Sequence, residues 1–403
     1  MRSHARAVAS LGPRTILSVG LLTALAVLSW LTARPLSASD LSLDGGQVET
    51  DSGSATIGSD LSEKFDLFGF VNLGYGVTDE RKYRGVTEDG TADLRTAALQ
   101  LRYYARERSQ FVLQLSHESV GTSPINDLRE DVEVDWLFFG HEFKDGTRVR
   151  LGRVPLPIGF YNEIKDAGVA LPFYRPSGNF YGEGTWTSDS VDGVVLTRSV
   201  ELGGDWQLSA DLYYGEWERI ETSGDGPTVG ESEIDDALGF YLWLDAPFAG
   251  LRVGVGANRF DATGGVFLAP GVTDEEETRY LSLQVGGAPW QLRFEMSRRE
   301  FTGGYWQPYY LELLYRPTDR LQLAAIYDVG DLLFEIPFFA TFDDTIEESI
   351  GLGVAYTLRP DLVLKAEHHW VDGFGQIEDI PLNIFFDDPV EVNLFIVSLS
   401  ASF

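Results

Sequence analysis

The sequence predicts an all-β fold, a transmembrane antiparallel up-and-down β-barrel of about 16 strands with a constriction loop after strand five. Many short segments carry apolar side chains at alternate positions, which is the period of a β-strand. Short turns alternate with long connections along the chain. No segment after Ala33 is long and apolar enough for a membrane-spanning helix, so membrane residence would require a closed barrel.

The N-terminal residues 1–38 have the layout of a secretory signal peptide. Arginines at the start precede an apolar stretch from Thr15 to Ala33, and Leu36-Ser37-Ala38 supplies small residues for cleavage. An uncleaved membrane helix is the alternative, because the apolar stretch is long enough to span a bilayer. Residues 39–64, rich in Asp, Ser and Gly, are predicted to form a flexible acidic segment before a barrel of residues 65–403.

The strands are predicted from the alternation of their apolar residues. In chain order they are residues 65–75, 97–103, 111–115, 132–138, 149–151, 191–200, 206–214, 238–244, 251–257, 281–285, 290–296, 309–315, 321–327, 350–356, 362–366 and 392–403. The clearest segments, such as residues 206–214, alternate without a break, whereas residues 191–200 are poorly phased. The resulting even number of strands is the number that bacterial barrels require.

The connections between these strands fall into two classes. The short ones contain turn residues and comprise residues 105–110, 144–146, 246–250, 286–289, 316–319 and 359–361. The long ones comprise residues 78–93, 155–190, 215–236, 261–278, 330–347 and 372–391. This alternation indicates periplasmic turns and external loops. A soluble all-β repeat protein is the alternative, although it has no reason to separate its loops by length.

Aromatic residues lie near the predicted strand ends. With odd strands running outward, four fall at the inner rim (Trp206, Trp290, Tyr315, Phe403) and two at the outer rim (Tyr309, Trp370). Amphipathic rings prefer membrane interfaces, so the pattern predicts two aromatic girdles.

The external connections are strongly acidic. Acidic runs occur at residues 274–277, 343–348 and 387–388, and we predict solvated external surfaces there. Cation enrichment or divalent-cation binding at the mouth is the alternative interpretation. The formal net charge of the chain is -31 at pH 7, which excludes nucleic acid as a partner because phosphates require a basic surface.

Motifs for catalysis or for cofactor binding are absent from the sequence. There is no cysteine, and the adjacent His368 and His369 of one strand would point to opposite faces, so they cannot share a metal. We therefore expect no catalytic residue, cofactor or bound metal, and no enzyme activity. A barrel hydrolase with an exposed Ser–His pair stays open as a minor alternative.

Two stretches carry a resemblance to a known family. The terminal strand, which ends in the aromatic Phe403, resembles the closing strand of bacterial outer-membrane barrels, where the last aromatic is an assembly signal. Leu151-Gly152-Arg153, Pro157–Tyr161 and Lys165-Asp166 resemble the Gly-Arg-x-Pro-x-Gly-x-Tyr…Arg-Asp stretch of Gram-negative porins, in particular the phosphate-selective O and P type. Lys165 replaces the expected Arg, and the chain has no lysine cluster for phosphate selectivity.

The resemblance implies a location, partners and a function. The protein would lie in the outer membrane of a Gram-negative bacterium, in contact with its lipid, as a homotrimer. It would form a water-filled channel for passive diffusion of small hydrophilic solutes and ions. A structural or adhesive barrel with a plugged lumen and acidic surface loops is the alternative.

Alternate residues of a strand face the lumen, and these positions give the candidate constriction residues. The wall contributes Arg102, Arg148 and Arg150, and the loop of residues 155–190 contributes Glu163, Lys165, Asp166 and Arg175. About 16 strands close into a cylinder roughly 30 Å across, too wide for side chains to fill. Wall arginines facing loop carboxylates would orient solutes and favour anions at high salt. Alternatively, these charges only pair with neighbours and keep the wall solvated.

Overall fold

The computed structural model describes residues 64–128, 132–182, 189–222, 229–265, 271–336, 340–373 and 390–403. The predicted signal peptide, residues 39–63 of the predicted acidic segment and the acidic pair at residues 387–388 lie outside the described residues. Within the described part of the chain, no helix is long and apolar enough to cross a membrane.

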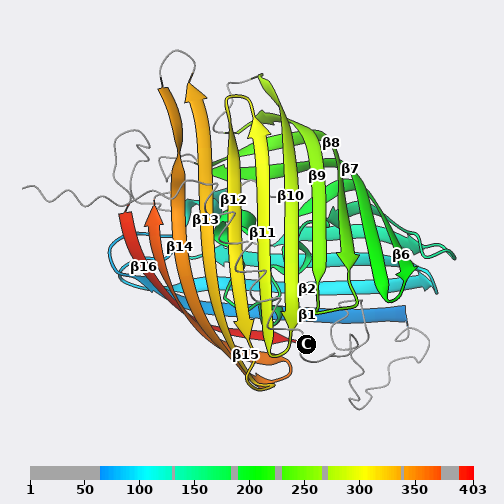
Figure 1. Ribbon diagram of the computed structural model, residues 1–403, viewed down its shortest axis with the longest axis horizontal. Coiled ribbons are helices and arrows are strands. Elements are labelled where there is room, and N and C mark those ends of the chain that lie inside the picture. Colours follow the sequence, from blue (N-terminus) through cyan, green and yellow to red (C-terminus); the bar gives the residue numbers. More distant parts are fainter. Residues whose placement is uncertain are drawn as a thin grey trace, which may run out of the picture.

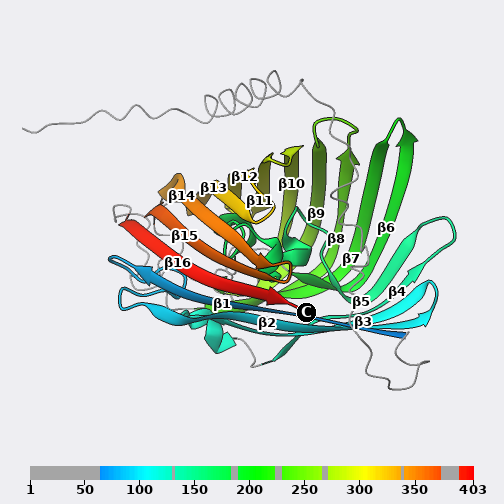
Figure 2. The same cartoon turned by 90° about the horizontal axis from the view of Figure 1, so that it is seen from below.

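The described residues form one closed barrel of 16 antiparallel strands (Figure 1). The strands are β1 (Phe65–Thr78), β2 (Thr91–Arg106), β3 (Ser109–Val120), β4 (Glu133–Glu142), β5 (Arg148–Pro155), β6 (Ser190–Gly203), β7 (Trp206–Thr222), β8 (Val229–Asp245), β9 (Arg252–Gly264), β10 (Thr273–Gly287), β11 (Trp290–Phe301), β12 (Gly304–Tyr315), β13 (Leu321–Ile336), β14 (Ala340–Arg359), β15 (Leu362–Gly373) and β16 (Val390–Ser402). Each strand pairs with its neighbours in the chain, and β16 closes on β1 with Val71 opposite Ala401 (Figure 2). This confirms the predicted up-and-down barrel.

The two faces of the wall have opposite chemistry. Apolar side chains of the predicted alternation face outward and are exposed, among them Leu67, Leu101, Leu212, Leu313, Leu352 and Leu364. Polar side chains at the intervening positions face inward and are buried, among them Asn72, Gln114, Ser282, Glu295, Glu312 and Ser400. An apolar exterior around a polar interior is the arrangement of a barrel that is solvated by lipid.

Aromatic rings gather at the ends of the strands that carry the short turns. Phe65 lies 4.8 Å from Tyr103, and Phe111 lies 5.1 Å from Phe139, between ring centroids. Trp290 stacks on Tyr315 at 3.9 Å, where the predicted inner girdle places both residues. Contacts between rings at this level are suited to a membrane interface.

The strands reach further toward the long-loop side than the sequence predicts. The connection predicted over residues 215–236 is largely a hairpin, because β7 continues to Thr222 and β8 starts at Val229. A register shift between Gly215 and Trp217 breaks the alternation at the predicted strand end. The apolar pattern therefore stops at this irregularity although the hydrogen-bonded ladder continues.

Two acidic runs that were predicted to be solvated loops lie instead on strands, residues 343–348 on β14 and residues 274–277 on β10. Residues 274–277 belong to β10, where Asp274 and Glu276 are buried and Glu275 and Glu277 are exposed. Asp274 accepts hydrogen bonds from the backbone N–H of Thr302 at 3.0 Å and from its hydroxyl at 2.5 Å. The period of two thus also governs the charged residues, so the prediction of a fully solvated run was wrong here.

Candidate functional site

The described part of the chain between β5 and β6 lies inside the barrel. It contains three short helical turns, η3 (Asn162–Ile164), η4 (Gly168–Ala170) and α2 (Gly178–Tyr181). The turn α2 contacts β11, β12 and β13, whereas η4 contacts β1 and β16. We call the described residues 156–182 the lumen loop.

Glu295 of β11 is a central anchor of the lumen loop. Its carboxylate accepts hydrogen bonds from the Phe160 backbone N–H at 3.1 Å and from the Tyr181 hydroxyl. Two wall hydroxyls, those of Ser282 and Tyr310, donate to the same carboxylate. The Glu295 side chain is fully buried, so these four donors replace the water that its oxygens lose.

Two more wall carboxylates bind the loop in the same way. Glu312 of β12 accepts from the Tyr161 hydroxyl at 2.5 Å and pairs with Arg293 at 3.4 Å. Asp328 of β13 accepts from the Ser177 hydroxyl at 2.8 Å and from the Gly178 N–H at 2.9 Å. The second contact satisfies one of the N–H groups that the start of α2 leaves without a partner.

On the far side of the loop, β15 supplies both a donor and an acceptor. The buried Lys365 Nζ donates to the carbonyls of Gly168 at 2.5 Å and Phe173 at 2.7 Å. Glu367 accepts from the Tyr174 N–H at 2.8 Å. Charged side chains on the inward face of the strands therefore fix the path of the lumen loop across the barrel.

Gly159 explains one glycine of the porin-like motif. Its φ of 63° lies in the left-handed region, and a Cβ there would meet the Tyr181 hydroxyl and the Glu295 carboxylate. A glycine is therefore required where the loop approaches its anchor. Arg153 of the motif instead faces outward and forms an ion pair with Asp192 at 2.7 Å.

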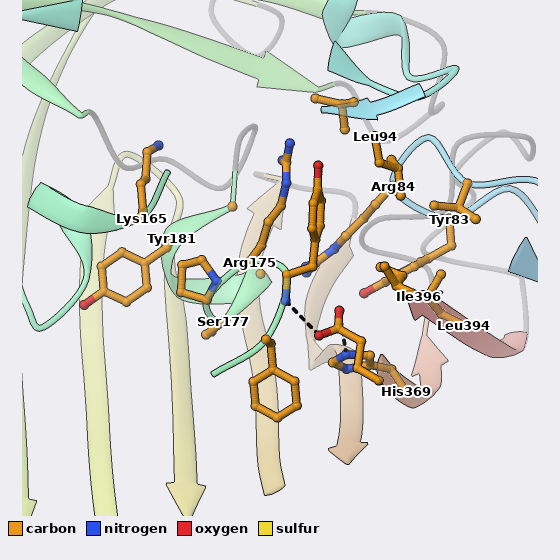
Figure 3. Close-up of a pocket in the computed structure, with 18 of the residues that line it drawn as sticks. Tyr83, Arg84, Leu94, Lys165, Arg175, Ser177, Tyr181, His369, Leu394 and Ile396 are labelled. Carbon is orange, nitrogen blue, oxygen red and sulfur yellow. Dashed lines mark hydrogen bonds and ion pairs between the residues drawn. The ribbon is translucent and has the colours of Figure 1, made fainter. Parts of the chain in front are cut away.

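A cavity of about 110 Å³, with a largely apolar lining that carries several charged side chains, lies beside the lumen loop (Figure 3). Its charged lining comprises Arg84, Glu118, Lys165, Asp166, Arg175, Asp328 and Glu367. These residues come from the loop between β1 and β2, from the lumen loop and from the wall. Charges of both signs therefore surround the cavity.

The loop between β1 and β2 reaches into the barrel, although the sequence predicts an external connection there. The Tyr83 hydroxyl donates to Glu347 of β14 at 2.8 Å, and Arg84 pairs with the same carboxylate at 3.4 Å. Glu347 was predicted to be a solvated acid and is only 1% exposed, because this loop covers it. A usable signal was Tyr83-Arg84-Gly85-Val86, a turn flanked by two apolar residues.

Three predicted loop residues line the cavity. Lys165 pairs with Asp189, and Arg175 pairs with Glu118. Asp166 lies between these pairs, and burial raises its pKa to about 8 even though Lys165 acts in the opposite direction. The predicted loop residues Lys165, Asp166 and Arg175 are thus brought together.

The wall arginines lie elsewhere. Arg150 pairs with Glu163 of the lumen loop at 3.4 Å, the wall-to-loop pairing that the sequence suggests. Arg148 pairs with Glu142 at 3.6 Å and is half exposed. Arg102 lies 3.4 Å from the Tyr104 hydroxyl. None of the three wall arginines lines the cavity, and neither does Glu163.

We expect Arg150→Gln to lower the anion-to-cation permeability ratio more than Arg148→Gln does. The Arg150 side chain is 12% exposed and faces the loop, whereas that of Arg148 is 48% exposed near a turn. One partly exposed charge is worth up to about 1 kcal/mol, roughly fivefold in this ratio. Reversal potentials across a KCl gradient measure the permeability ratio. An unchanged potential in the variant that carries both substitutions would show that neither arginine borders the path.

The described residues do not suggest a metal centre. No group of three or more His, Cys, Asp or Glu side chains in the described ranges could hold a metal ion. His369 lies next to Glu367 at 3.5 Å, inside the barrel, while His368 contacts the ring of the exposed Trp370 at 4.3 Å. The two adjacent histidines therefore face opposite sides of the wall.

Solved structures with the same architecture are outer-membrane proteins. OmpF of Salmonella typhi, in complex with daunomycin, matches with a TM-score of 0.58 at 12% identity, over 84% of this chain and 97% of that one. An anion-selective porin from Comamonas acidovorans matches with a TM-score of 0.53 at 14% identity, over 84% and 99%. The outer membrane channel DcaP of Acinetobacter baumannii matches with a TM-score of 0.53 at 11% identity, over 84% and 97%.

These matches establish the class of fold. No family model matches the chain, and no curated protein sequence matches it either. At such low identities the likeness concerns the fold alone. The chain has the 16-stranded barrel fold that outer-membrane porins share.

Proposed function

We propose that the protein is an outer-membrane porin that forms a water-filled channel for passive diffusion of small hydrophilic solutes and ions. The observation that carries the proposal is a loop fixed inside a closed lipid-facing barrel, beside a cavity with charges of both signs. A loop that narrows the lumen without covalent chemistry is suited to sieving solutes.

We also propose that the chain is exported by its N-terminal signal peptide, sits in outer-membrane lipid and assembles as a homotrimer. The exposed apolar belt supports the lipid contact. For the trimer contact we favour the outward faces of β6, whose apolar alternation is poorly phased, and of β9.

The relationship to the phosphate-selective O and P type is a finer proposal, which rests on the stretch from Leu151 to Asp166. We do not extend it to phosphate as the solute, because Lys165 is the only lysine that lines the described cavity.

A plugged structural or adhesive barrel is the second candidate. One observation favours it: buried apolar side chains from the lumen loop and from several strands form a continuous cluster inside the barrel, including Ile158, Tyr161, Phe173, Phe180, Tyr213, Tyr241 and Tyr310. In that case acidic external surfaces would bind partners, and protease removal of the loops would abolish adhesion.

Liposome swelling separates the two candidates. Vesicles that contain the purified protein should swell in isotonic arabinose at a rate proportional to protein content, and more slowly in a larger sugar such as raffinose. Vesicles with the inserted protein that swell no faster than empty ones would rule out the channel.

A further inference from the structure

We infer that Arg84, at the tip of the loop between β1 and β2, is a solute-contacting cation of the cavity and gives the channel a preference for small carboxylates. The inference rests on the proposed channel function and names a solute class for it. Arg84 lies outside the porin-like motif and outside the sequence-predicted constriction residues.

The loop that carries Arg84 is firmly seated in the barrel. Tyr83 and Val86 are 3% and 1% exposed, and they pack in one cluster with Leu94, Tyr174 and inward residues of β15 and β16. Arg84 and Gly85 have φ values of 48° and 75°, the left-handed conformations of a tight turn. The turn directs Arg84 toward the lumen loop (Figure 3).

The guanidinium of Arg84 reaches the lumen loop at Gly178. A Cβ on Gly178 would overlap the Arg84 guanidinium, so the missing side chain provides the space for it. Arg84 thus borders the cavity from one loop while Arg175 borders it from the other. Both guanidinium groups therefore add positive charge to one cavity, that of Arg175 in an ion pair with Glu118.

Arg84 keeps unused hydrogen-bond donors. A guanidinium has five N–H groups, and among the described residues Arg84 makes one hydrogen bond, a 3.4 Å approach to Glu347, and lies over the ring of Tyr83. Its buried Nε has no hydrogen-bond partner among the described residues. The whole side chain is 25% exposed, which leaves it accessible from the cavity.

Three of the four acidic residues that line the cavity have partners in the protein. Glu118 pairs with Arg175, Asp328 accepts from Ser177 and Gly178, and Glu367 accepts from Tyr174 and pairs with His369. The buried Nε of Arg84, by contrast, needs an acceptor. A carboxylate is the acceptor whose two oxygens match a guanidinium.

The size of the cavity limits the carboxylate. The cavity volume of about 110 Å³ is several times the roughly 10–15 Å³ that holds one water molecule on the same measure. A monocarboxylate of a few heavy atoms, such as acetate, fits this space. The alternative role of Arg84 is to fix its loop to Glu347 without contacting solute, so the test separates carboxylate recognition from charge and from folding.

The test uses the full-length protein in planar bilayers, with KCl on one side and potassium acetate on the other. We expect Arg84→Gln and Arg84→Lys both to lower the acetate-to-chloride permeability ratio about tenfold, the value of one charge-assisted hydrogen bond. Arg84→Lys should keep the anion-to-cation ratio, which Arg84→Gln lowers. Glu347→Gln should raise the acetate ratio, because it removes the competing carboxylate but keeps an acceptor for Tyr83.

Arg259→Gln is the matched control, since Arg259 forms an ion pair with Glu275 at 3.3 Å on the exposed outer face. It should leave both ratios unchanged. If the channel conducts and Arg84→Lys retains the acetate-to-chloride permeability ratio of the natural chain, the inference of carboxylate recognition by Arg84 is wrong, whereas the proposed channel function is unaffected. If the natural chain inserts and does not conduct, the proposed function fails and the inference fails with it.

Discussion

Replacing Glu295 by Gln should raise the single-channel conductance severalfold and make the current noisier. Glu295 accepts hydrogen bonds from Phe160 and Tyr181 of the lumen loop and from two wall hydroxyls. An amide offers one acceptor oxygen and adds two donors, so at least two buried donors lose their partner. Each costs about 1–3 kcal/mol, which should release the loop from the wall for part of the time.

Glu300→Gln is the control for this variant. Glu300 lies on the same strand, faces outward and pairs with Arg298 at 3.1 Å, with its side chain 46% exposed. It should conduct as the natural protein does, and both variants should show the same heat-induced shift in gel mobility. A Glu295→Gln channel with unchanged conductance and noise would mean that this carboxylate does not fix the loop.

Deleting Phe403 should lower the ratio of assembled to unassembled barrel about thirtyfold, because it removes two main-chain hydrogen bonds worth about 1 kcal/mol each at the closing seam. The Phe403 N–H donates to the Gly69 carbonyl, and the Gly69 N–H donates to the Phe403 carbonyl, each at 2.9 Å. The Phe403 ring also covers Gly69, where a Cβ would collide with it. The fraction of protein that shows heat-modifiable mobility measures assembly.

Two further variants separate the ring from the backbone. Phe403→Tyr keeps both and should assemble normally. Phe403→Ala keeps the main-chain hydrogen bonds and loses the ring. Its assembled fraction should therefore lie between that of Phe403→Tyr and that of the deletion variant. Equal assembly of all three would show that neither the seam nor the terminal aromatic is limiting.

The barrel was predictable because its signal is local. Residues such as Leu313 and Leu352 alternate with polar neighbours, and the structure exposes both on the outer face. The proximity of Arg150 and Glu163 was also accessible, since they are only 13 positions apart at the root of the lumen loop. Strand parity and short separation are sufficient for such inferences.

The anchors of the loop were not predictable in the same way. Tyr181 and Glu295 are 114 positions apart, and Tyr83 and Glu347 are 264 apart. Their meeting depends on the closed register of all the strands between them and on how deeply each loop enters. Alternation along β11 places Glu295 on the inward face but does not identify its partners, and Glu347 was predicted to be a solvated acid of an external connection. Nothing in the sequence therefore favours anchoring of the loop over lining of a path.

The most direct test of the central claim, a water-filled passage beside the fixed loop, is conductance of the purified natural protein in a planar bilayer. We expect stepwise current increases of uniform size as barrels insert, with larger and noisier steps for Glu295→Gln. Barrels that insert, shown by protection from added protease and by heat-modifiable mobility, but that leave the membrane resistance unchanged would contradict it.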